Sequence, residues 1–393
     1  MSQTEQNNKI NTISRLLEDL FEVGAIYEQA DHLVINLSNR FDKETSIKLV
    51  SDRLELAGYT FKISDNNGEL YIRIDPKARL KIPTINIVLF LVTLLTVYVV
   101  PVLYLQSEVA YYSYRWNAGI LPGEDLSAWE SLKITIVSFP DTMVRTLDAL
   151  AHGAGIQFTL AMISILFVHE MGHFVASRRR KIITSWPYFI PAPNIIGTFG
   201  AIIKAKSPFW NRRDLIEVGA AGPIAGWLVA IAWLWYGLSR SVLLPQDVAR
   251  VGDYPFYLYG ESLLMRLSAI TIVGQPPANF EYLLTEAAFA GWVGLLVTAI
   301  NLLPIGQLDG GHIIYGLGRR WQYYFGMAAM GALLVMGYYS PIWWVFAAFG
   351  LIFGVKHPPT LNDYKKPGGV ATGMGILALI VLVISFTPIP FGL

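Results

Sequence analysis

The sequence predicts a polytopic α-helical membrane protein with a small soluble α+β domain at its N-terminus. Three observations lead to this fold class. The 393 residues are 53% hydrophobic and only 15% charged, whereas a soluble domain carries about 25% charged residues. Several stretches stay apolar over the roughly 20 residues that a helix needs to cross a bilayer. Residues 1–80 instead mix polar and apolar positions, so we expect a soluble domain there and a transmembrane domain over residues 84–390.

Charge and cysteine content narrow the possible chemistry. The net charge of +1 gives no support to a nucleic-acid partner. The chain has no cysteine, so it has no disulfide framework, and a zinc ion would have to be held by histidine and carboxylate side chains. The first nine residues are polar, so we expect no cleavable signal peptide.

The N-terminal 80 residues carry both helical and strand patterns. Apolar residues recur at helical spacing over residues 10–21 and again over residues 45–57. Residues 33–37 are strand-like. Residues 59–64 and 69–74 flank an Asp-Asn-Asn-Gly turn, which predicts a β-hairpin.

Membrane-length apolar segments follow through the rest of the chain. The predicted spans, about six to seven helices, are residues 84–105, 155–177, 215–238, 287–318, 321–338, 341–355 and 370–386. Pro304-Ile305-Gly306 interrupts the long fourth segment and predicts a broken helix whose unwound point lines a cavity. Residues 186–203 are too rich in proline and glycine for a helix and too apolar for a loop, so we expect a re-entrant hairpin. Residues 106–154 and 239–285 are expected to be loops.

The span at 155–177 contains the sequence His169-Glu170-Met171-Gly172-His173. Two histidines four residues apart on a helix share a face, so both imidazoles can bind one metal ion. Glu170 is then placed to hold a water molecule and accept its proton. Ionisable residues in a membrane segment are rare and usually functional. The competing interpretation is that three polar residues satisfy one another at a helix end.

A catalytic zinc site needs a third protein ligand, and no acidic residue occurs between Met171 and Arg213. The candidates in other spans are Glu217, Glu286, Asp309 and His312. Glu217 and Glu286 lie at span ends, where a solvated charge is expected. We favour Asp309, which follows the predicted helix break at a depth similar to that of the histidines. Asp309 as a simple helix cap is the alternative. His312, one turn further, is predicted to hold the Asp309 carboxylate from behind.

The distribution of basic residues predicts the orientation. They concentrate at 77–81, 178–181, 204–213 and 319–320, which fall on one side of the membrane if the spans alternate. That side is expected to be cytoplasmic, with residues 1–80 on it and the metal about 7 Å inside that face.

Two motifs carry a resemblance to a known family. His169–His173, together with Asn-Leu-Leu-Pro-Ile-Gly-Gln-Leu-Asp-Gly-Gly at residues 301–311, resembles the site-2 protease family of intramembrane zinc metalloproteases, peptidase family M50. Residues 290–312 and the Gly-Thr-Phe-Gly stretch at 197–200 are most similar to the prokaryotic relatives of the plant chloroplast group. Two features depart from the family: Leu302 stands where many members have proline, and no PDZ-like domain is visible.

The resemblance implies an activity, a cofactor and a set of residues. One zinc ion per chain is held by His169, His173 and Asp309, and Glu170 is the catalytic base. The substrate is a single-pass transmembrane protein in contact with membrane lipid, cut within or near its span in a prokaryotic cell membrane. A hairpin beside the site pairs with the substrate through Gly197, Phe199, Gly200, Ala201 and Ile202.

Asn301 is an amide within an apolar helix and therefore needs a partner. It either caps carbonyls freed by Pro304, or its NH2 group faces the metal and binds the oxyanion of the reaction. Two rival functions use the same ligands: a zinc transporter or sensor, in which Glu170 has no task, and a catalytically silent membrane scaffold.

Overall fold

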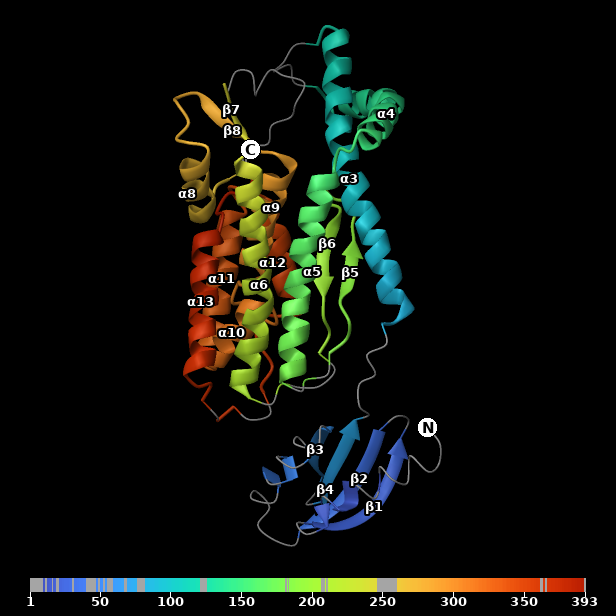
Figure 1. The fold of residues 1–393 in the computed structure, drawn as a ribbon, viewed down its shortest axis with the longest axis vertical. Coiled ribbons are helices and arrows are strands. Elements are labelled where there is room, and N and C mark those ends of the chain that lie inside the picture. Colours follow the sequence, from blue (N-terminus) through green and yellow to red (C-terminus); the bar gives the residue numbers. More distant parts are fainter. Residues whose placement is uncertain are drawn as a thin grey trace. The chain divides into compact units, whose positions relative to one another are not determined.

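The computed structural model describes the whole chain (Figure 1) except for a set of short stretches. These are residues 1–9, 11–12, 16, 19–20, 30–31, 40–46, 49, 52–53, 55–58, 67–68, 76–81, 121–125, 181, 183, 206–208, 210, 246–259, 361–362, 365 and 392–393. The chain forms two compact units. The small unit comprises Met1–Lys81, Ser177–Ser185 and Ala205–Ser207, and the large unit comprises Ile82–Ala176, Trp186–Lys204 and Pro208–Leu393.

The small unit is built on a four-stranded antiparallel sheet of order β1-β2-β4-β3. The strands are β1 (Phe21–Gln29), β2 (His32–Asn39), β3 (Thr60–Asn66) and β4 (Glu69–Asp75). The buried side chains include Ile13, Leu17, Leu54 and Ile72, so helical residues cover the sheet.

The sequence predicted the β3–β4 hairpin and the position of β2, but it missed β1. It assigned Phe21 to the end of a helix, whereas Phe21 begins a strand. A bulge between Val23 and Ile26 interrupts the pairing of β1 with β2. A bulge breaks the two-residue alternation by which a strand is recognised in a sequence.

Helices dominate the large unit, as predicted. They are α3 (Thr84–Asn117), α4 (Ala128–Ala151), α5 (Ile156–Arg179), α6 (Arg212–Leu238), α8 (Leu263–Ile272), α9 (Glu286–Asn301), α10 (Asp309–Leu317), α11 (Trp321–Met336), α12 (Ile342–Phe353) and α13 (Gly369–Ser385). Among the described residues, three of them, α3, α5 and α6, are long and apolar enough to cross a membrane. Shorter apolar helices include α8, α9, α12 and α13.

The two regions predicted to be loops contain regular structure. Helix α3 continues to Asn117, and α4 follows it, beginning with a capping box in which Ser127 and Glu130 bond each other's backbone N–H. Further along, α8 lies between β7 (Val242–Pro245) and β8 (Phe280–Leu283), which pair with each other. The sequence did not reveal α4, because charged residues interrupt its apolar positions. In the structure the apolar side of α4 is exposed rather than buried.

A β-hairpin stands beside α5. Its strands are β5 (Tyr188–Pro191) and β6 (Thr198–Ile202), and Figure 1 draws it between α5 and α3. At the entry, the Asn86 side chain of α3 donates to the carbonyls of Trp186 and Pro187, at 3.1 and 2.7 Å. The hairpin is therefore attached to α3 through polar contacts as well as packing.

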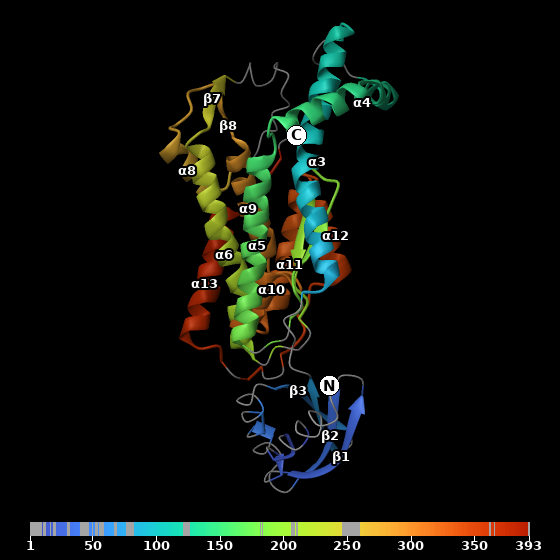
Figure 2. The ribbon, with the colours of Figure 1, turned by 45° about the vertical axis from the view of Figure 1, so that its right-hand side comes forward.

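Helix α6 is the centre of the bundle, and it packs against α9, α10 and α13 (Figure 2). Helix α9 is almost wholly buried and ends at Asn301, and α10 begins at Asp309. The predicted interruption at Pro304-Ile305-Gly306 lies in the turns between them. The chain thus brings Asp309 back into the bundle at the start of a new helix.

Candidate metal centre

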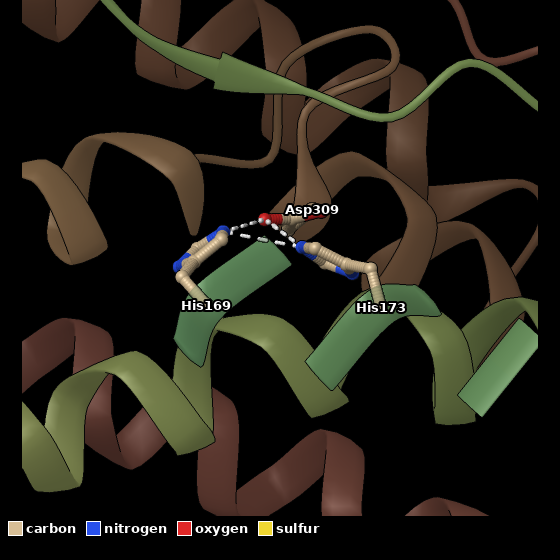
Figure 3. A group of neighbouring side chains, drawn as sticks. All are labelled: His169, His173 and Asp309. Atoms are coloured by element: carbon tan, nitrogen blue, oxygen red, sulfur yellow. Dashed lines mark hydrogen bonds and ion pairs between the residues drawn. The ribbon is translucent and has the colours of Figure 1, made fainter. Parts of the chain in front are cut away.

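His169 and His173 lie one turn apart on α5 and face the same point (Figure 3). Their Nε2 atoms are 3.1 Å apart. His169 is 5% exposed and His173 is partly buried. The shared face expected from the four-residue spacing is therefore present in the structure.

Helix α6 makes room for both imidazoles with two glycines. A Cβ atom on Gly222 would collide with Nε2 of His173, and a Cβ on Gly226 would lie 2.9 Å from Cβ of His169. Gly172 of α5 in turn leaves space for the Ala221 carbonyl, 2.6 Å from where its Cβ would stand. In the sequence, Gly222 and Gly226 are four residues apart, a spacing that is typical of closely packed helices. In the structure, these two glycines leave the space that the two histidine side chains occupy.

A backbone carbonyl of α6 fixes the orientation of the second histidine. Nδ1 of His173 lies 2.8 Å from the carbonyl oxygen of Val218. A carbonyl only accepts, so Nδ1 carries the proton, and the lone pair of Nε2 faces the site. This is the tautomer that a metal-binding histidine needs.

Asp309 completes the group as the first residue of α10. Its Oδ2 atom lies 3.4 Å from Nε2 of His169 and 3.3 Å from Nε2 of His173 (Figure 3). The position before it, Leu308, makes no side-chain cap. Among the described residues, Asp309 directs its carboxylate to the two histidines rather than to its own helix end.

The three side chains fit a zinc ion. Zn–N and Zn–O bonds of about 2.0–2.2 Å at tetrahedral angles place ligand atoms about 3.3 Å apart. The observed separations of 3.1, 3.3 and 3.4 Å match one face of such a tetrahedron. Within the described residues, this is the one group of three or more such side chains whose ligand atoms converge, all within 4.8 Å. A zinc ion bound by these three side chains would have its fourth coordination position left for water or substrate.

Glu170 lies next to the first histidine and is 5% exposed. The ionisable groups nearest to it are His169, His173 and Asp309. A carboxylate in this place is not required as a ligand, because three others already converge. It is therefore free to handle protons.

Two of the alternative ligands have other tasks. Glu217 pairs with Arg213 of the same helix at 2.8 Å. Glu286 accepts hydrogen bonds from the backbone N–H groups of Gly155 and Phe158, at 2.8 and 3.4 Å. We predicted a solvated charge at Glu286, but it caps the start of α5 from a neighbouring helix.

His312 has a partner that the sequence did not indicate. Its Nδ1 lies 2.6 Å from Nε2 of His357, in the segment between α12 and α13. Sequence reasoning missed His357, because it is far along the chain and belongs to no recognisable motif. Asn301 is the last residue of α9 and is partly buried.

The residues of the predicted substrate hairpin divide into two sets. Gly197 adopts a φ of +75°, and a Cβ on it would lie 2.5 Å from the Thr96 carbonyl of α3, so it packs against that helix. Ala201 packs on the core. Phe199 and Ile202 are 67% and 56% exposed, and Gly200 has open space around it. The exposed set lies on β6, and Figure 3 draws a strand in the hairpin colour running past the three side chains.

Comparisons with known proteins match the region that bears this site. The model of peptidase family M50 matches residues 157–336. The chain is 32% identical over 242 residues, 60% of its length, to the Arabidopsis thaliana protein named probable zinc metalloprotease EGY1, chloroplastic, of which the match covers 43%. It is 29% identical over 255 residues to the Oryza sativa subsp. indica protein named probable zinc metalloprotease EGY2, chloroplastic, covering 64% of this chain and 46% of that one. The chain thus spans less than half the length of these curated relatives. No solved structure matches the chain.

Proposed function

From the membership of residues 157–336 in peptidase family M50, we propose that this protein is an intramembrane zinc metalloprotease that hydrolyses peptide bonds in or near transmembrane segments of other proteins. The observation that carries the proposal is the convergence of His169, His173 and Asp309 at the spacing of a zinc tetrahedron. A buried carboxylate, Glu170, lies beside them.

The roles of the side chains follow from their chemistry. A zinc ion held by the two histidines and Asp309 would polarise a peptide carbonyl and acidify a water molecule. Glu170 accepts the proton of that water and later delivers it to the leaving amine. The Val218 carbonyl holds the His173 ring in the tautomer that this arrangement requires. Asn301 offers its NH2 group to the oxyanion, and its alternative role is to cap the end of α9.

The hairpin supports a mode of substrate binding. The carbonyls of a transmembrane helix are engaged in its own hydrogen bonds, so the helix must unwind before it is cut. Among the described strands, β6 pairs with β5 alone, which leaves its other edge to accept an extended chain. Gly197 fixes the hairpin turn to α3, while Phe199, Gly200 and Ile202 face outward for the substrate.

The membrane setting is a further part of the proposal. The distribution of basic residues favours a cytoplasmic position for residues 1–80 and for the metal-bearing side of residues 84–390. The prokaryotic cell membrane is proposed from the family resemblance alone. The substrate is a single-pass membrane protein, and membrane lipid surrounds the remaining helices. The names of the relatives place those proteins in chloroplasts.

Co-expression with tagged single-span membrane proteins tests the activity. Wild-type protein should release fragments of a substrate, and Glu170→Gln should abolish them while binding zinc as the wild type does, because Glu170 is not a ligand. Metal analysis of both purified proteins is the control. Cleavage by Glu170→Gln at the wild-type rate would disprove the mechanism, and zinc binding without any cleavage by the wild type would favour a transporter or sensor.

A further inference from the structure

Asp309 is mounted on the least regular part of the metal centre. Residues 302–308 make turns rather than a helix, and α10 is only nine residues long. An isolated helix of this length is only marginally stable in water, so α10 depends on its contacts with the rest of the protein. The position of the Asp309 carboxylate therefore depends on what fastens this segment.

Gln322 fastens the break. This side chain, on the first turn of α11, is 1% exposed. Its Nε2 donates to the carbonyls of Pro304 and Val355, at 3.3 and 2.9 Å, and its Oε1 accepts from the backbone N–H of His357 at 3.0 Å. The N–H of Gly306 also donates to the Val355 carbonyl, at 2.9 Å. One buried amide thus ties the helix break to the segment that follows α12.

His357 fastens the first turn of α10. Its Nδ1 lies 2.5 Å from the Pro358 carbonyl and must donate to it. Burial lowers the pKa of His357 to about 4, so the ring is neutral and its Nε2 accepts. The contact at 2.6 Å therefore has Nδ1 of His312 as its donor. His312 lies one turn after Asp309, so this bond holds the first turn of α10.

Asp363 fastens the end of α10. The Tyr315 hydroxyl donates to Oδ2 of Asp363 at 2.7 Å, and Arg319 lies 3.6 Å from the same oxygen. The N–H and hydroxyl of Thr360 donate to Oδ1, at 3.2 and 2.6 Å. The segment after α12 is thus bonded to the α10 region at three places along its length.

We propose that Gln322 and His357 are positioning residues for the metal centre, which hold the segment 302–317 so that the Asp309 carboxylate meets the two histidines. The proposal rests on the metal site of the proposed function. Neither side chain points to the metal, and each acts through the backbone or ring of a residue near Asp309. Replacing either residue leaves the three ligand residues unchanged in the sequence, but it should let Asp309 move from its position and weaken the zinc site.

The test measures zinc affinity of the full-length protein in detergent, by competition with a chelator. Gln322→Met keeps the size of the side chain and removes its three hydrogen bonds. His357→Phe keeps an aromatic ring and removes the hydrogen bonds of the imidazole to His312 and to the Pro358 carbonyl. Each should bind zinc about 10–100-fold more weakly, as losses of groups that support ligands typically do. Asn86→Leu is the matched control, because it also removes a buried amide that donates to two carbonyls. Its zinc affinity should equal that of the wild type.

The thermal unfolding of the metal-free proteins separates positioning from stability. If the two variants bind zinc as tightly as the wild type and only unfold more easily, like Asn86→Leu, these residues are structural and the inference is wrong. If Gln322→Met does not fold, His357→Phe decides the question alone. A wild-type protein that binds no zinc would overturn the proposed function itself, whereas tight binding by wild type and variants alike overturns only this inference.

Discussion

His169 and His173 are carried by a 24-residue helix, whereas Asp309 opens a nine-residue helix after a break. The histidines are located by packing, since two glycines of α6 receive their rings. The aspartate is located by hydrogen bonds from a distant part of the chain. The two sides of one metal centre are therefore sensitive to different changes: added volume on the histidine side, and lost polar contacts on the aspartate side.

The largest effect should come from adding a single methyl group on the histidine side. Gly222→Ala places a Cβ against Nε2 of His173, so the ring must leave its position, and we expect nearly all bound zinc and activity to be lost although no ligand has changed. Metal analysis of the purified protein measures this. Gly331→Ala on α11 is the control, because nothing lies within 4 Å of its added Cβ. Full zinc content in Gly222→Ala would show that packing does not locate the histidines.

A smaller effect is expected at the boundary of the two sides, where α9 ends. Asn301→Ala should retain zinc and its melting temperature, while turnover falls by about 10²–10³, or about 2.7–4 kcal/mol, the usual effect of losing one oxyanion donor. Cleavage kinetics together with thermal unfolding measure this. A destabilised variant whose folded fraction turns over normally would assign Asn301 to the helix end instead.

The smallest effect concerns the far end of the histidine helix. Glu286→Gln weakens a charged cap on the start of α5, and caps contribute about 1 kcal/mol. We expect a modestly lower melting temperature with unchanged zinc affinity, because the cap lies more than three helical turns from His169. A loss of zinc affinity would contradict this expectation and show that the cap at the start of α5 affects the position of His169.

The same contrast explains how much the sequence could predict. The long helices follow from hydropathy, and the His169–His173 face follows from helical geometry. Asp309 was inferred from its place after Pro304, because a break in a membrane helix exposes polar groups. These are local patterns.

The unpredicted features depend on contacts between distant parts of the chain. The contact between His312 and His357 joins residues 45 positions apart and was not predicted. Glu286 was expected to be solvated, but it caps a helix that begins 130 residues earlier, at Ile156. Helix α4 has its apolar side outward, which no rule for soluble helices anticipates. Such pairings require the three-dimensional arrangement.

The pairing of α5 with α6 limits which insertions and deletions the chain can tolerate. His173 faces Gly222 and His169 faces Gly226, so both helices have the same four-residue step in antiparallel register. One inserted residue within α6 would rotate everything beyond it by about 100° and turn a larger side chain toward an imidazole. Length changes within either helix are therefore expected to be destructive, because they break this register. A natural or designed variant should therefore keep the four-residue spacing of both the histidines and the glycines if it is to bind zinc.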